Sequence, residues 1–236
     1  MVIGGFSKGD RNPPLEIIDL IDTTSKPIIV IDTTGSRKGA IGGILQNKPV
    51  ICGGYDTDIK TIPNYSIIGM SNNDFKMMSP RDFSASIALN ESKIWVTGGY
   101  SIHFGKSNRY ITSTTEIISL DQPPVAGPNF PFTVREHSMV LVNPTTIYLI
   151  GGFQNGELSN KTWIIDQSNN FQIRLGPPLN IARLAHSCSK MKIEGKNFLV
   201  AAGGKCKMSK ELLDSVELLD TTCPDHGWKM GTYELI

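Results

Sequence analysis

The sequence of 236 residues lacks several features that would point to particular classes of protein. It has 23 basic and 22 acidic residues, so its net charge of +1 provides no basic surface of the kind that nucleic acid requires. No apolar run approaches the ~20 residues of a membrane-spanning helix, and the first residues show no signal peptide. Four cysteines are too few and too scattered for a disulfide framework, which favours a reducing, cytoplasmic location. We therefore expect a partner other than nucleic acid or a membrane.

Motifs of catalysis are missing as well. There is no Gly-x-Ser-x-Gly nucleophile elbow, and the paired glycines end strands where a phosphate-binding loop would open a helix. Cys223-Pro224-Asp225-His226 has the ligand spacing of half a zinc site, but no second pair with that spacing accompanies it. The sequence therefore predicts a protein without enzymatic activity, cofactor or metal.

Pairs of glycines, by contrast, recur at a regular interval. Each pair follows a run that is apolar in at least its last positions, and successive pairs stand about 50 residues apart, a period typical of kelch-type propeller blades. The first pair is Gly4 and Gly5. The other glycines are Gly53, Gly54, Gly98, Gly99, Gly151, Gly152, Gly203 and Gly204.

Each repeat is predicted to contain four short strands. An arginine (Arg37, Arg81, Arg135 or Arg183) precedes a predicted hairpin whose second strand runs into the glycines, and a third and fourth strand follow a variable loop. No helical spacing is present, so the fold class is all-β. Consecutive apolar positions before the glycines predict a strand covered on both faces, and glycine permits a positive φ and the close approach of another backbone.

The combination resembles the kelch repeat, and its fullest copy runs from Arg183-Leu184-Ala185-His186 through Gly203 and Gly204 to Trp228. The resemblance covers essentially the whole chain. It implies a single kelch-type β-propeller domain over 1–236, with about five four-stranded blades. The approximate repeats are 1–36, 37–80, 81–134, 135–182 and 183–236. Because the first repeat opens at its second strand, we expect the first blade to lack one strand and the ring to be incomplete.

The resemblance also indicates where a partner would bind. In kelch-type propellers the residues after each glycine pair and shortly after the repeat arginine lie near one mouth of the central channel. Here the aromatic and histidine residues at these positions are Tyr55, Phe83, Tyr100, His137 and Phe153. The longest variable loop, 101–110, adds His103, Arg109 and Tyr110. Such residues suit peptide recognition, and the alternative is that they only fill the base of the loops.

These observations favour a non-catalytic protein–protein interaction module. Its propeller-face loops would bind a protein or peptide partner, as in kelch propellers that recruit substrates or bind the cytoskeleton. Two alternatives remain open. One is a metal-oxidase propeller similar to galactose oxidase, which would need cysteine, tyrosine and histidine residues to converge on copper. The other is a truncated product without independent function.

Overall fold

The protein is all-β in the computed structural model, which describes residues 15–17, 28–30, 38–55, 64–67, 74–102, 108–120, 122–206 and 212–231. Among these residues the one helical segment is η1 (Pro224–His226), a single 3-10 turn. No helix in the described part of the chain has the length and hydrophobicity needed to cross a membrane. The chain divides into two compact units, Met1–Gly127 and Pro128–Ile236, which are considered separately below.

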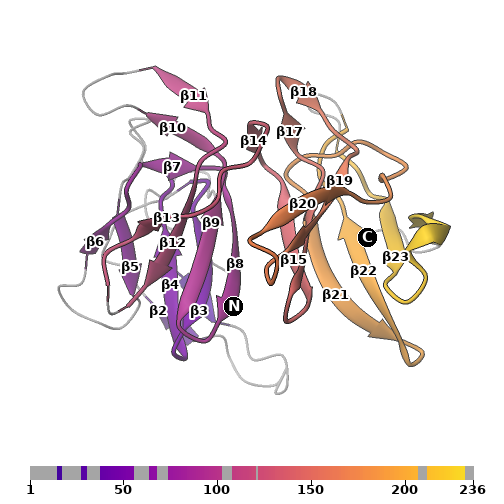
Figure 1. The fold of residues 1–236 in the computed structure, drawn as a ribbon, viewed down its shortest axis with the longest axis horizontal. Coiled ribbons are helices and arrows are strands. Elements are labelled where there is room, and N and C mark those ends of the chain that lie inside the picture. The colour runs from indigo at the N-terminus through magenta and orange to yellow at the C-terminus, as the bar shows by residue number, and fades with distance from the viewer. Residues whose placement is uncertain are drawn as a thin grey trace. The chain divides into compact units, whose positions relative to one another are not determined.

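The first unit contains two four-stranded antiparallel sheets whose strands pair in chain order (Figure 1). One sheet consists of β3 (Ile41–Leu45), β4 (Lys48–Cys52), β5 (Asn64–Ile67) and β6 (Asp74–Lys76). The other consists of β8 (Ala85–Asn90), β9 (Lys93–Thr97), β12 (Thr115–Ser119) and β13 (Val125–Ala126). A further pair is formed by β1 (Leu15–Ile17) and β2 (Ile28–Val30).

A small sheet lies at one end of the long strands in the first unit (Figure 1). Its strands are β7 (Arg81–Asp82), β10 (Tyr100–Ile102) and β11 (Arg109–Ile111), with β10 in the middle. Since β10 begins directly after Gly98 and Gly99, the glycine pair is the corner at which the chain leaves the long sheet for the small one.

The second unit repeats this arrangement. One long sheet consists of β15 (Ser138–Asn143), β16 (Thr146–Ile150), β19 (Thr162–Asp166) and β20 (Gln172–Leu175). The other consists of β21 (Ser187–Ile193), β22 (Lys196–Ala202), β23 (Val216–Asp220) and β24 (Lys229–Met230). The small sheet consists of β14 (Val134–Arg135), β17 (Phe153–Gln154) and β18 (Glu157–Leu158).

Each unit has a hydrophobic core to which both of its long sheets contribute. In the first unit the buried residues are Leu45, Val50, Cys52, Met77, Ile94, Val96 and Ile118. In the second they are Val140, Tyr148, Ile150, Ile164, Leu179, Leu199, Ala201, Leu219 and Trp228. Strand β9 is buried at four consecutive positions and so is covered on both faces, as its uninterrupted apolar sequence predicts. The predicted four-strand repeat is present twice in each unit.

The glycine pairs occupy the crowded positions that the sequence predicts. Gly152 has a φ of +86°, and a Cβ added there would lie 2.7 Å from the carbonyl oxygen of Arg135 and 2.8 Å from Cβ of His137. Its N–H donates a hydrogen bond of 2.8 Å to the carbonyl of Arg183, in the neighbouring repeat. Glycine is required here for two separate reasons, because a side chain would be strained and would also collide with backbone atoms.

Two alanine substitutions separate these reasons. Gly156 has nearly the same φ, +87°, but an added Cβ there would meet nothing within 4 Å. Gly156→Ala should therefore lower the free energy of unfolding by about 1 kcal/mol through backbone strain alone. Gly152→Ala should lower it by about 2 kcal/mol more, through collision with its neighbours. Urea unfolding of both variants measures the difference, and equal losses would contradict the close approach.

Candidate functional site

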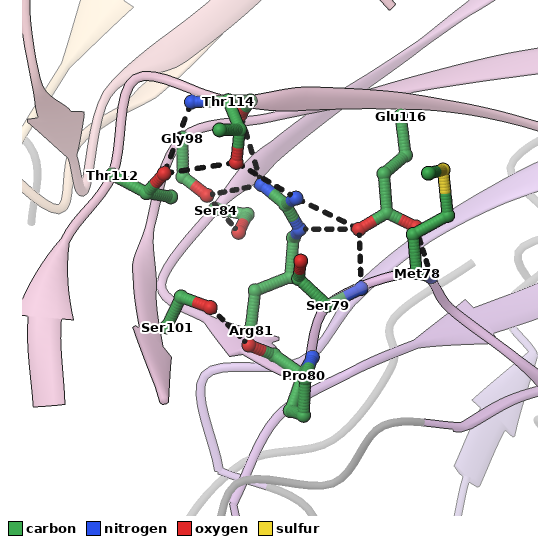
Figure 2. Close-up of polar contacts among 10 residues, drawn as sticks. All are labelled: Met78, Ser79, Pro80, Arg81, Ser84, Gly98, Ser101, Thr112, Thr114 and Glu116. Carbon is green, nitrogen blue, oxygen red and sulfur yellow. Dashed lines mark hydrogen bonds and ion pairs between the residues drawn. The ribbon is translucent and has the colours of Figure 1, made fainter. Parts of the chain in front are cut away.

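A buried arginine ties the small sheet of the first unit to its long sheet (Figure 2). Nε and Nη2 of Arg81 lie 3.0 and 2.7 Å from Oε1 of Glu116, and Nη1 donates to the carbonyls of Gly98 and Thr114. The Glu116 carboxylate also accepts the N–H groups of Met78 and Ser79, at 2.7 and 3.1 Å. Both side chains are at most 2% exposed, so the ion pair is buried with its hydrogen bonds satisfied.

The last repeat has a similar arrangement, except that Nε of Arg183 has no hydrogen-bond partner among the described residues. Arg183 Nη2 lies 2.8 Å from Oε1 of Glu217, and Nη1 donates to the carbonyls of Gly203 and Ser215. The Glu217 carboxylate accepts the N–H groups of Asn180 and Ile181. In both of these repeats, the repeat arginine and the glutamate of the third strand form a buried structural ion pair.

The repeat between them departs from this pattern, and it corrects the sequence-based alignment. A positive φ marks the equivalent residue of each repeat, which is Phe83, Glu136 or Ala185. Two residues before it stand Arg81, Val134 and Arg183 respectively, so Val134 occupies the arginine position, where the sequence analysis placed Arg135. The sequence is misleading here because an arginine happens to stand one residue later.

Four of the residues predicted to bind a partner come together at the small sheet of the first unit. Cζ of Arg109 lies 4.4 Å from the ring centroid of Tyr100 and 5.3 Å from that of Tyr55. The Phe83 ring lies 5.8 Å from Tyr55 and 6.5 Å from Tyr100. All four side chains are partly exposed. We call Tyr55, Phe83, Tyr100 and Arg109 the aromatic–arginine cluster.

The buried Asp82 side chain holds the arginine of this cluster in position. Its carboxylate forms an ion pair with the Arg109 guanidinium, and its side chain is 0% exposed whereas that of Arg109 is 24% exposed. Successive strand residues point to opposite faces, so the burial of Arg81 on one face of β7 directs Asp82 to the other. Asp82 pairs in register with Tyr100, which places the acid next to the ring that Arg109 covers. Arg81 therefore lies on one face of the small sheet, and Tyr100 and Arg109 lie on the other.

Two cationic side chains lie near the aromatic rings. Nζ of Lys38 lies 6.0 Å from the Tyr55 centroid, so Lys38 and Arg109 both approach the rings while Asp82 supplies one negative charge. Cation–π contacts and the ion pair hold the arginine in place, which lowers the entropic cost of using it in a contact. Sequence analysis did not single out Asp82 or Lys38. The alternation of β7 and the bridge between Lys38 and Tyr55 explain both positions.

The other predicted residues lie elsewhere. Tyr110 follows Arg109 in β11 and is 37% exposed on the opposite face of that strand. His103 lies outside the described residues. Phe153 and His137 belong to the second unit, where Cζ of Arg135 lies 4.5 Å from the Phe153 ring and His137 is buried beneath Gly152.

Two buried histidines in the second unit are held in the neutral form. Burial, followed by the charge of His186, lowers the pKa of His137 to about 3. Burial, followed by the charge of Arg183, lowers the pKa of His186 to about 3. The nearby Cys188 thiol has its pKa raised by burial to about 12, so it is a poor nucleophile. The two histidines are buried and Cys188 is half-buried, and the pKa shifts keep all three uncharged near neutral pH.

No three His, Cys, Asp or Glu residues in the described ranges are grouped so that they could hold a metal ion. Comparison with known proteins adds no assignment, since no family model matches the sequence and no curated protein gives a significant match.

Removing one member of the buried ion pair should be strongly destabilising. Glu116→Ala leaves the Arg81 guanidinium and two N–H groups without their carboxylate, so the free energy of unfolding should fall by about 3 to 5 kcal/mol. Glu91→Ala removes an exposed carboxylate from the same unit and should change it by less than about 0.5 kcal/mol. Chemical denaturation compares the two, and similar small losses would refute the role given to Glu116.

The buried histidines predict a loss of stability in mild acid. Their pKa values are lowered in the folded state, so below an unfolded pKa of about 6.5 only the unfolded chain takes up protons. Stability should fall by up to about 1.4 kcal/mol per pH unit for each histidine between pH 6.5 and 3. Denaturation between pH 7 and pH 5 measures the slope. His186→Leu should flatten it, with the exposed His226→Gln as control, and an unchanged slope in His186→Leu would contradict the assignment.

Proposed function

We propose that the four long sheets are blades of a kelch-type β-propeller. Three features support this proposal. The strands of each sheet are paired antiparallel in chain order. The first strands of neighbouring sheets are linked, by Ser86 Oγ to the Gly42 carbonyl in the first unit and Ser138 Oγ to the His186 carbonyl in the second. The glycine pairs make close backbone contact between repeats at one end of the strands. A kelch assignment rests on the repeat of arginine, glycine pair and glutamate.

We further propose that the protein is a non-catalytic interaction module that binds a protein or peptide partner through the aromatic–arginine cluster. The observation that carries this proposal is a group of three partly exposed aromatic rings. Two of them contact a guanidinium that a buried carboxylate holds in position. Tyrosine and arginine dominate the energetics of protein interfaces, and ordered side chains lose less entropy on binding. The guanidinium of Arg109 has five N–H donors and is partly exposed, which favours a segment with a carboxylate or another acceptor group.

The proposal is tested by selecting peptides from a displayed random library against the full chain. Peptides that bind the cluster should share a sequence pattern and should bind Tyr100→Leu at least about tenfold more weakly, because the ring supplies contact area and packs against Arg109. Arg109→Lys should also weaken binding, since lysine keeps the charge but loses the planar fork. Affinity is measured by isothermal titration calorimetry.

Two precautions make the result decisive. Arg109→Lys is preferred to Arg109→Ala because alanine would remove this ion pair from the buried Asp82 carboxylate and destabilise the unit. Val125→Ala changes an apolar residue of the same unit that is 52% exposed and distant in sequence from the cluster, and it should leave affinity unchanged. Selected peptides that bind all three variants equally would place the interaction away from this cluster.

A further inference from the structure

The second unit contains a pocket of about 600 Å³ that the sequence analysis did not anticipate. It lies beside the small sheet of that unit. The aromatic rings of Phe132 and Trp163 line it, and polar residues from the segment 154–161 supply most of the remainder. A pocket of this size is in the range of small-molecule sites.

The pocket lies in a repeat that lacks the ion pair seen at Arg81–Glu116 and Arg183–Glu217. In the register set by the positive-φ residues, Val134 stands at the position of Arg81 and Arg183. Trp163 stands at the position of Glu116 and Glu217. Phe132 stands at the position of Ser79, and its ring stacks on Trp163 at a centroid distance of 4.7 Å. Pro131 stands at the position of Met78, whose N–H needs the carboxylate. Proline has no N–H, so the glutamate is not required here.

Gln154 replaces the arginine from the opposite strand. Its Nε2 donates to the Gly151 carbonyl at 2.7 Å, equivalent to the bond from Arg81 to Gly98, and its Oε1 accepts from Trp163 Nε1 at 3.0 Å. Gln154 and Phe132 are both buried. The hydrogen bonds of Gln154 are therefore satisfied in the interior. In this repeat a neutral aromatic wall takes the place of the buried ion pair.

Several polar groups at the pocket retain hydrogen-bonding capacity. Asn155 uses Oδ1 to accept the Thr133 N–H, and Asn160 uses Nδ2 to donate to the Leu179 carbonyl, which leaves a donor on the first and an acceptor on the second. The charged groups of Glu157 and Lys161 are exposed and form no hydrogen bond or ion pair within the described ranges. Their opposite charges cancel, so the lining is neutral.

We propose that this pocket binds a short neutral saccharide. A pyranose ring has an apolar C–H face that packs on an aromatic wall, and its hydroxyl groups both donate and accept hydrogen bonds around the edge. The half-buried Trp163 ring, backed by the buried Phe132 ring, matches the face. The mixed donors and acceptors of Asn155, Glu157, Asn160 and Lys161 match the edge. A charged ligand would find no net opposite charge. This inference does not depend on the proposed peptide-binding function, which uses the first unit.

The test is a titration of the full chain with a panel of saccharides. The panel contains the methyl glycosides of glucose, galactose, mannose and N-acetylglucosamine, together with cellobiose and chitobiose, each up to about 20 mM. Trp95 and Trp228 are buried whereas Trp163 lines the pocket, so a saturable change in tryptophan fluorescence reports occupancy. At least one saccharide should bind saturably, and calorimetry should confirm its affinity.

Variants at the pocket make the proposal falsifiable even if one of them fails to fold. Trp163→Leu should weaken binding about tenfold or more. Glu157→Gln and Lys161→Met alter exposed groups without bonds in the described ranges, and each should weaken it about threefold. Glu91→Gln and Lys192→Met, at exposed sites elsewhere, are the matched controls and should bind like the original chain. Absence of saturable binding across the panel, equal binding by all variants, or a preference for free phenylalanine over every saccharide would each overturn the proposal.

Discussion

The buried ion pair between Arg81 and Glu116 is the interaction on which the candidate site of the first unit depends. One guanidinium joins the carbonyl after a glycine corner, the start of the third strand and a carboxylate that also binds two backbone N–H groups. Three separate stretches of chain, 78–81, Gly98 and 114–116, are thereby held together. A buried charge is costly when it loses its partner, so these hydrogen bonds form together or not at all. They therefore fix the geometry at that end of the sheets.

The candidate site is a consequence of that fixed geometry. The small sheet is too short to be stable alone, but the buried arginine on one face fixes which residues appear on the other. In the first unit the exposed side carries an acid, a guanidinium and aromatic rings. In the second the equivalent side carries Arg135 and Phe153. The exposed residues differ between the two small sheets, which suits a surface for recognition.

Sequence reasoning predicted the all-β fold, the four-strand repeat and the role of the glycines because these depend on local patterns: apolar runs, turn residues and a regular interval. It also named Tyr55, Phe83, Tyr100 and Arg109, which the structure brings together. It did not find the Asp82–Arg109 ion pair or the pocket at Trp163, because both arise from register between strands that are distant in sequence. The offset from Arg135 to Val134 has the same cause, since only the positive-φ residues define the register there.

The aromatic replacement in the second unit also constrains how such a chain can diverge. Exchanging the arginine for valine alone would leave a buried carboxylate without its ion-pair partner. Exchanging the glutamate for tryptophan alone would leave a buried guanidinium without its partner. The residues that replace the ion pair depend on one another, and they are Pro131, Val134, Gln154 and Trp163. A repeat can therefore exchange the ion pair for the aromatic wall only by changing these positions together, because each single exchange leaves a buried group without its partner.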